Sequence, residues 1–363
     1  MPSSDKKLRT GYTTGTCASA AAKAGIRFLL TGKRAAAVDT PLPDGNRLAV
    51  PIERLDSEGP LARVTVIKDG GDDPDATHGA EIQAVVGLHD MAEPLSVLVE
   101  GGRGVGRVTL PGLPVPVGEA AINPAPRAQI ERAVLEGAEG LEAGVVSVLV
   151  EVPEGEALAH RTMNLRLGIV GGISILGTHG IVKPYSHDSW KASIAEALDV
   201  ARAQGLDHVV FTTGRRSEKF YLEQFPETPK LAMVQAADFF EFSMRSAAEK
   251  GFGSVSWALF FGKLVKHAQG LAYTHAKTHP VDFGLLAGLC AEAGAASDLL
   301  PSIEKANTAR QVLEMFKGGE ILPPLLSLLK KKACAAARGF AGREIDVRYV
   351  VFDFDASELT SRN

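Results

Sequence analysis

A turn rich in hydroxyl groups lies near the start of the chain, at Thr13, Thr14, Gly15 and Thr16, and leads directly into an alanine-rich segment. Alanine and leucine are strong helix formers, so residues 16–30 are predicted to be a helix. The unpaired N–H groups at a helix N-terminus bind anions well. The turn is therefore a candidate substrate-binding site. Ordinary N-capping by the threonines, worth on the order of 1 kcal/mol, is the alternative.

An acidic loop with the sequence DGGDDPDATHG spans residues 69–79. A calcium loop of the EF-hand type needs a bidentate glutamate at its twelfth position. Counted from each of the first three aspartates, that position holds alanine or glutamine, so the segment is not such a loop. Asp72, Asp73 and His78 remain candidates for binding a ligand. A solvated acidic turn is the alternative.

Two glycine-rich turns follow apolar runs, one at residues 101–106 and one at Gly171 and Gly172. Neither has the dinucleotide-binding pattern G-x-G-x-x-G. In open α/β sheets, ligands bind outside the carboxyl ends of parallel strands. By this rule Gly171, Gly172, Thr213 and Gly214 are candidates for binding a cofactor. Taken singly, each glycine is more often a tight turn.

Two pairs of arginines lie in or after such turns: Arg103 with Arg107, and Arg215 with Arg216. A guanidinium binds a carboxylate through two parallel hydrogen bonds, so both pairs are candidates for binding an acidic substrate. For the second pair, a solvated helix start is the alternative.

No protein-bound metal is predicted. His275 and His279 have the spacing of a helical zinc pair, but Pro280 pushes the residue before it out of the α region. The three cysteines are scattered and form no C-x-x-C pair. The chain also has no Ser-His-Asp order and no lipase elbow, so hydrolase chemistry has no support and no catalytic residue is identified.

Composition excludes several classes of partner. The formal net charge of -4 gives no strongly basic face for nucleic acid. No apolar run approaches the roughly 20 residues that span a bilayer, and the first residues lack the apolar core of a signal peptide. Scattered cysteines fit a reducing compartment. We therefore expect a cytoplasmic protein without membrane or nucleic-acid partners; its oligomeric state is not indicated.

The order of predicted elements indicates two domains. Residues 1–155 contain the first helix, a run of short strands and a helix near residue 126, which is an α+β pattern. From the apolar run at 165–170 onward, strands and helices alternate, which indicates βαβ units and a Rossmann-like, doubly wound parallel sheet. This second domain is expected to span residues 156–363. A strand at 343–354 is expected to join one of the two sheets.

Four long segments together resemble one family, the CbiD family of cobalt-precorrin-5B C1-methyltransferases. They are LRTGYTTGTCASAAAKA (8–24), KDGGDDPDATHGAEI (68–82), GGRGVGRVTLPGLPVPVGEAAINPAPR (101–127) and LGIVGGISILGTHGIVKPYS (167–186). The later pieces FFGKLVKHAQG (260–270) and the pair Thr274-His275 fit as well. The motifs are long, ordered and spread over most of the chain. At His179 and Gly70 the sequence departs from the expected pattern, which affects pocket detail.

The resemblance implies S-adenosylmethionine-dependent methylation of ring carbon C1 of cobalt-precorrin-5B, giving cobalt-precorrin-6A in cobalamin biosynthesis. The methyl group on a sulfonium is already activated, so alignment matters more than a general base. The carboxylates of the tetrapyrrole would face the arginines and the threonine turn, and a cleft between the two domains is the expected place for the site. Methylation of a metal-free precorrin, and a non-catalytic corrinoid-binding protein, remain alternatives.

Overall fold

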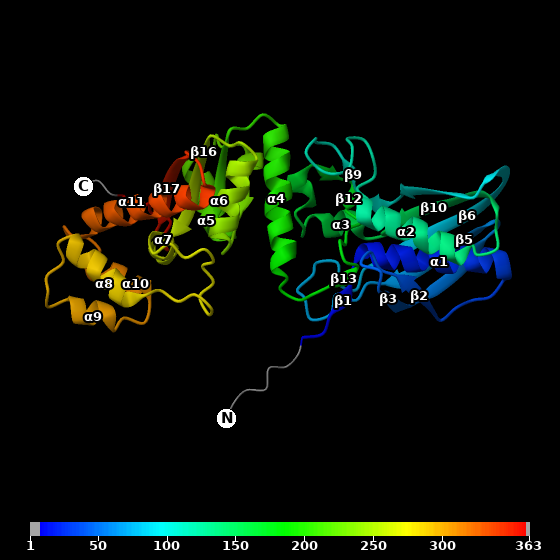
Figure 1. The fold of residues 1–363 in the computed structure, drawn as a ribbon, viewed down its shortest axis with the longest axis horizontal. Coiled ribbons are helices and arrows are strands. Elements are labelled where there is room, and N and C mark those ends of the chain that lie inside the picture. The colour runs from blue at the N-terminus through cyan, green and yellow to red at the C-terminus, as the bar shows by residue number, and fades with distance from the viewer. Residues whose placement is uncertain (1–7, 361–363) are drawn as a thin grey trace, which may run out of the picture. The chain divides into compact units, whose positions relative to one another are not determined.

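The computed structural model describes residues 8–360, without the side chains of residues 90–92. It consists of two compact units, residues 1–187 and 188–363 (Figure 1). The chain thus divides after His187, whereas the sequence predicted a boundary near residue 155. The reason is that residues 165–182 pair with strands of the first unit.

Unit 1 is built around a five-stranded sheet of order β4-β5-β6-β10-β7. Pairing is antiparallel except between β10 and β7. Side chains in β10 alternate between buried and partly exposed, as a half-buried strand requires. The bounds are β4 (Arg54–Glu58), β5 (Leu61–Ile67), β6 (Glu81–Pro94), β7 (Ser96–Gly101) and β10 (Ala143–Glu151).

Two helices cover this sheet, α1 (Thr14–Thr31) and α2 (Pro124–Gly137). The small side chains of α1 let its backbone approach the strands closely. A Cβ added at Gly25 would lie 2.6 Å from a methyl group of Val86. The helix ends at Gly32, which adopts the left-handed conformation and donates its N–H to the carbonyl of Phe28 at 2.7 Å.

Short strand pairs complete unit 1 and tie distant segments together. Residues 8–12 and 101–122 are joined in this way to residues 164–182. The pairs are β1 (Gly11–Tyr12) with β13 (Ile181–Val182), β2 (Ala37–Pro41) with β3 (Arg47–Pro51), β8 (Gly104–Val105) with β12 (Gly172–Ile173), and β9 (Arg107–Val108) with β11 (Ile169–Val170); the short helices are α3 (Gly155–Ala159) and η1 (Asn164–Leu167).

Unit 2 contains a four-stranded sheet in which all pairs are parallel, of order β15-β14-β16-β17. The strands are β14 (His208–Thr212), β15 (Met233–Gln235), β16 (Ser254–Phe260) and β17 (Asp346–Phe352). The predicted C-terminal strand is thus β17, and it joins this sheet. Since β15 lies on one side of β14 and β16 on the other, the order reverses between β14 and β16. Such a switch point is where open α/β sheets bind ligands.

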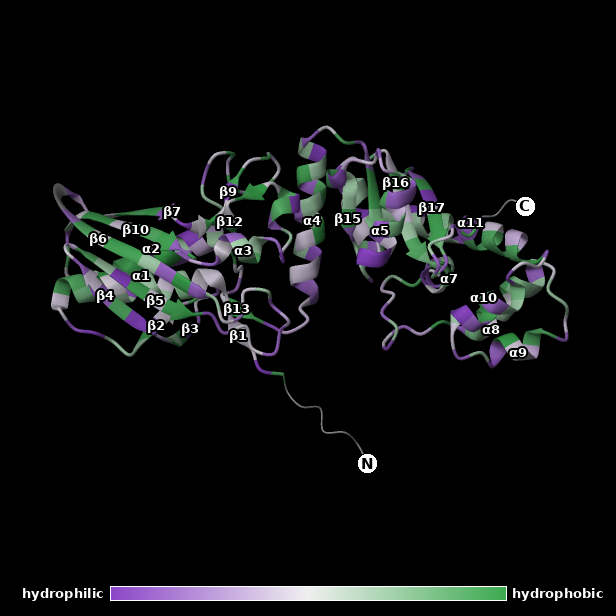
Figure 2. Cartoon of the chain, turned by 180° about the vertical axis from the view of Figure 1, so that it is seen from behind, coloured by the Kyte–Doolittle hydropathy of each residue, from purple (hydrophilic) through white to green (hydrophobic). Residues whose placement is uncertain are grey.

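Helices cover both faces of the parallel sheet. On one face α5 packs with Val210, Met233 and Phe352. The other face carries the larger core, built from Val209, Phe211 and side chains of the remaining major helices. Both sheets are largely hydrophobic in Figure 2. The bounds are α4 (His187–Ala203), α5 (Arg215–Gln224), η2 (Lys230–Ala232), α6 (Phe240–Glu249), α7 (Phe261–Ala268), α8 (Phe283–Glu292), α9 (Leu300–Glu304), α10 (Ala309–Phe316) and α11 (Leu322–Ala341). No helix among the described residues is long and apolar enough to cross a membrane.

Candidate functional site

The carboxyl edge of the parallel sheet brings the predicted residues Thr213 and Gly214 to the switch point. β14 ends at Thr212, and the chain continues through both residues into α5. Gly214 is extended (φ 162°), and a Cβ added there would meet nothing within 4 Å. No side chain caps the first N–H groups of α5. Free N–H groups at the end of a strand suit a polar or anionic ligand.

Thr212 itself is fully buried, and its hydroxyl has no hydrogen-bond partner. Its carbonyl accepts two bonds, from the N–H of Ala236 at 2.9 Å and of Ala237 at 3.2 Å. Ala237 has a φ of +49°, a left-handed conformation that is strained for a residue with a Cβ. The turn after β15 is therefore held against the end of β14. A strained residue and an unsatisfied buried hydroxyl thus lie at the same edge of the sheet, which makes this edge a candidate site.

Next to Ala237, a polar cluster joins Asp238, Lys263, Lys266 and Thr274. The Thr274 hydroxyl donates to Oδ1 of Asp238 at 3.1 Å, and the Lys263 ammonium forms an ion pair with the same carboxylate. Both lysines donate to the carbonyl of Thr274. None of these four residues was assigned a role from the sequence. The available signal was the motif at 260–270 with Thr274, which carried the family resemblance.

The two arginines at the start of α5 have different surroundings. The Arg216 guanidinium donates to the carbonyl of Phe354 and lies 5.6 Å from the ring centre of Phe260. Its charge is therefore engaged with an aromatic cluster. Arg215 is exposed, and within residues 8–360 its side chain has no hydrogen-bond or ion-pair partner. Of the two, Arg215 is the one available to a carboxylate.

Gly171 and Gly172 do not follow a strand of the parallel sheet, which corrects the sequence prediction. The apolar run at 165–170 was expected to be a strand of the same parallel sheet. It forms η1 and the two-residue strand β11 instead, and Gly172 pairs with Gly104 in β12 and β8. A Cβ on Gly172 would lie 2.1 Å from the carbonyl oxygen of Gly104. Gly172 is thus required for the close approach of two backbones.

The other arginine pair lies in this glycine-rich region of unit 1. Arg107 donates to the carbonyl of Gly118 and to the carboxylate of Glu100, both at 3.1 Å. Arg103 is exposed, and its guanidinium has no partner among the side chains that the structure describes. Arg103 is therefore the freer of the two predicted carboxylate ligands.

The three hydroxyls of the threonine turn are already bonded within unit 1, so they are less available to a ligand than the sequence predicted. Thr13, Thr14 and Thr16 are each at most 5% exposed. The Thr13 hydroxyl caps α1 by accepting from the Thr16 N–H at 3.2 Å. The N–H of Gly15 donates to the carbonyl of Leu176 at 3.2 Å. The capping alternative is the one the geometry favours.

The turn also fixes a distant segment, residues 176–180. The Thr14 hydroxyl donates to the carbonyl of Leu176 and accepts from its N–H at 2.9 Å, and Thr16 donates to the carbonyl of Gly180 at 2.8 Å. These bonds link two motifs that lie far apart in the sequence. The threonines therefore position residues 176–180, and whether any of them contacts substrate stays a prediction.

Replacing Thr13 and Thr14 together with alanine should lower the free energy of unfolding by about 2–4 kcal/mol, because a helix cap and two buried hydrogen bonds are lost. We expect methyl transfer to fall as well, since residues 176–180 lose their anchor. Urea unfolding of the purified variant measures the first effect. Thr31→Ala, at the exposed end of the same helix, is the control. An unchanged unfolding midpoint in the double variant would contradict this role.

The acidic loop is held by internal bonds more than a solvated turn would be. Asp72 accepts from the N–H of Arg9 at 2.7 Å, and Asp73 accepts from the N–H of Tyr185 at 2.9 Å. The Nδ1 atom of His78 accepts from the N–H of Gly70 at 3.0 Å. The three predicted ligand residues thus order one loop against β1 and residue 185. Asp72 and His78 stay exposed, so contact with a ligand remains open to them.

Cys17 lies in the first turn of α1 and is fully buried. Burial raises the pKa of its thiol to about 12, and Lys68 opposes this only in part. The thiolate is the nucleophilic form, so Cys17 acts as a small buried hydrophobic residue and not as a nucleophile.

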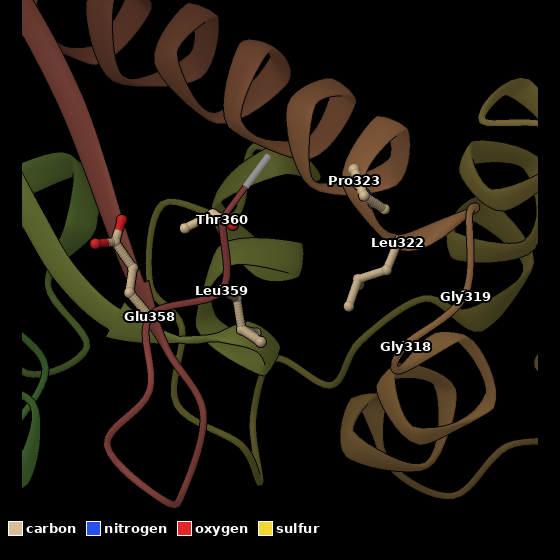
Figure 3. A pocket seen from close by; sticks show the side chains of 7 residues that line it. All are labelled: Gly318, Gly319, Leu322, Pro323, Glu358, Leu359 and Thr360. Atoms are coloured by element: carbon tan, nitrogen blue, oxygen red, sulfur yellow. The ribbon is translucent and has the colours of Figure 1, made fainter. Parts of the chain in front are cut away.

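Two further features, possible metal ligands and one surface hollow, add no other candidate site among residues 8–360. Residues 8–360 hold no group of three or more His, Cys, Asp or Glu side chains placed to bind a metal. In unit 2, an open hollow of about 270 Å³ lies beside Leu322 and Leu359 (Figure 3). Its one ionisable side chain, Glu358, accepts from the Gln224 amide. The hollow contains none of the residues that the sequence singled out.

Comparison with known proteins gives consistent matches along the chain. The CbiD family model matches residues 1–184, and the model of the CbiD C-terminal domain matches residues 273–363. A cobalt-precorrin-5B C(1)-methyltransferase of Nitratidesulfovibrio vulgaris is 50% identical over 362 residues, covering 98% of this chain and 92% of that protein. One from Geobacillus kaustophilus is 46% identical over 356 residues, covering 98% and 94%.

Among solved structures, the cobalamin biosynthesis protein (cbiD) of Archaeoglobus fulgidus has 29% sequence identity and a TM-score of 0.37, covering 71% of this chain and 79% of that chain. The family matches lie in both units, and the relatives align with almost the whole sequence. The chain belongs to the CbiD family.

Proposed function

We propose that this protein transfers a methyl group from S-adenosylmethionine to ring carbon C1 of cobalt-precorrin-5B, forming cobalt-precorrin-6A in cobalamin biosynthesis. The observation that carries the proposal is 50% identity over 98% of the chain to a relative named for this reaction.

In this reaction the ring carbon C1 supplies the electron pair of the new carbon–carbon bond. The bond between the methyl carbon and sulfur breaks, its electrons go to sulfur, and S-adenosylhomocysteine leaves. The protein must hold the two reactants in line and keep water away, and such positioning supplies several kcal/mol of the barrier. No general base is needed for the transfer itself. A site that binds the two reactants through arginines and backbone N–H groups is therefore sufficient.

We assign the donor to the carboxyl edge of the parallel sheet in unit 2, which we interpret as a Rossmann-like, doubly wound module. Three observations support this fit. Thr212 has an unpartnered buried hydroxyl, Gly214 borders open space, and the first N–H groups of α5 have no side-chain cap. Thr213 and Gly214 would contact the donor. Arg215, which follows this edge, is assigned to a carboxylate of the tetrapyrrole, and the same role for Arg103 and Arg107 of unit 1 stays a prediction.

A methyl-transfer assay tests the proposal directly. Purified protein is incubated with cobalt-precorrin-5B and S-adenosylmethionine carrying a labelled methyl group, and the tetrapyrrole is analysed by mass spectrometry. We expect one labelled methyl group per tetrapyrrole. Transfer only to the metal-free precorrin would change the substrate assignment. Tetrapyrrole binding without transfer, and without affinity for S-adenosylhomocysteine, would favour a carrier.

Gly214→Val is the cleanest probe of the donor site. A Cβ added at Gly214 has no protein atom within 4 Å and the backbone is extended, so the fold should be retained. We expect affinity for S-adenosylhomocysteine to fall at least about tenfold, because the side chain fills the space in front of α5. Calorimetric titration measures the change. Gly339→Val, also in open space, is the matched control. Wild-type affinity in folded Gly214→Val would place the donor elsewhere.

A further inference from the structure

Two lysines of α7 share one acceptor beside the proposed donor site. Nζ of Lys266 lies 2.8 Å from the carbonyl oxygen of Thr274, and Nζ of Lys263 lies 3.1 Å from the same atom. The two residues are three apart in one helix, so they project from the same side. Within residues 8–360, Asp238 is the carboxylate that pairs with either of them, and it pairs with Lys263.

The charges of this cluster do not balance. Lys266 is only 6% exposed, yet its ammonium has three N–H donors and one neutral acceptor. Burial lowers the pKa of Lys266 and the charge of Lys263 lowers it further, while Asp238 opposes both. A buried ammonium without a carboxylate partner is costly unless another anion completes it. The cluster therefore contains two positive groups and one negative group, so one further anion would balance its charge.

The cluster is placed where a reactant can reach it. Lys263 follows β16, and Asp238 follows the turn after β15, whose N–H groups bind the carbonyl at the end of β14. The carboxyl ends of β14, β15 and β16 therefore all lie beside this cluster. The side chains of Lys263 and Asp238 are 25% and 20% exposed, so the cluster is open to solvent on one side.

We propose that Lys263 and Lys266 form a binding subsite for a carboxylate of one of the two reactants. Asp238 and Thr274 orient Lys263, and the incoming carboxylate completes the charge around Lys266. The inference rests on the proposed function for its choice of ligands. The carboxylate comes either from the amino-acid part of the donor or from an acetate or propionate arm of the tetrapyrrole.

The test compares Lys266→Met, which keeps the length of the side chain and removes its charge, with wild type and with Lys331→Met on the exposed side of α11. Each protein is titrated with S-adenosylhomocysteine, with methylthioadenosine, which lacks the amino-acid part, and with cobyrinic acid, a stable corrin bearing carboxylates. We expect a loss of at least about tenfold for one carboxylate probe and wild-type affinity for methylthioadenosine. Lys266→Arg should restore most of the affinity.

Each result has a defined meaning. Weaker binding of S-adenosylhomocysteine alone assigns the subsite to the donor, and weaker binding of cobyrinic acid alone assigns it to the tetrapyrrole. Unchanged affinities, or an equal loss for all three probes, overturn the proposal. If Lys266→Met does not fold, the more exposed Lys263→Met takes the same titrations. Lysine-dependent binding in a protein that transfers no methyl group would refute the proposed function and leave the subsite standing.

Discussion

Replacing Gly172 with alanine is expected to destabilise unit 1 severely, by about 3 kcal/mol or more. The new Cβ would lie 2.1 Å from the carbonyl oxygen of Gly104 and 2.3 Å from its carbonyl carbon. Both are backbone atoms in a strand pair and cannot rotate away. Gly104 is equally constrained, since its own Cβ would lie 1.8 Å from the carbonyl oxygen of Val152. Urea unfolding monitored by circular dichroism measures the loss.

Gly171→Ala is the matched control, because a Cβ at that position meets nothing within 4 Å. Its φ of +82° is unfavourable for alanine, so a smaller cost of about 1–2 kcal/mol is expected. Equal costs at the two glycines would contradict the steric argument. Because the added atoms at Gly172 would damage the fold, a substitution there would not test donor binding.

The second large effect is expected for Asp75→Asn. Lys68 is 2% exposed, and its ammonium pairs with the Asp75 carboxylate. Removing the negative charge leaves an uncompensated ammonium in the core of unit 1, which costs about 3–5 kcal/mol. Thr77 also loses an ionised acceptor for its N–H and hydroxyl. Thermal and urea unfolding at pH 7 measure this loss.

Lys68→Met combined with Asp75→Asn should recover much of the stability, because no buried charge then lacks a partner. A double variant as unstable as Asp75→Asn alone would refute this explanation.

The pH dependence of stability provides a second check. Burial raises the pKa of Asp75, but Lys68 and Thr77 outweigh it, so the folded pKa lies below the usual value. The stability it confers is therefore present at neutral pH and lost as pH falls through that pKa, a loss that Asp75→Asn cannot show.

Local sequence patterns predicted most elements of secondary structure. The helix predicted at residues 16–30 is α1, and the strand predicted at 343–354 is β17. Strand β4 has the mostly polar sequence RLDSE, which gives no local signal for a strand. The run at 165–170 was misassigned because its apolar pattern suits a buried strand as well as a short helix followed by a bridge. Periodicity alone cannot separate these two.

By itself, the sequence determined the family, the reaction that the family implies, and the order of most helices and strands. These properties are written in long local motifs and in short-range periodicity. Only the tertiary structure decided which groups are free to act. The hydroxyls of Thr14 and Thr16 donate to carbonyls of residues 176–180, so they are not free for a ligand. Gly172 is required where its backbone lies against that of Gly104. Lys263 and Lys266 meet Thr274 at a sheet edge. Hydrogen-bond satisfaction and charge balance depend on contacts between distant segments, and no local pattern encodes them.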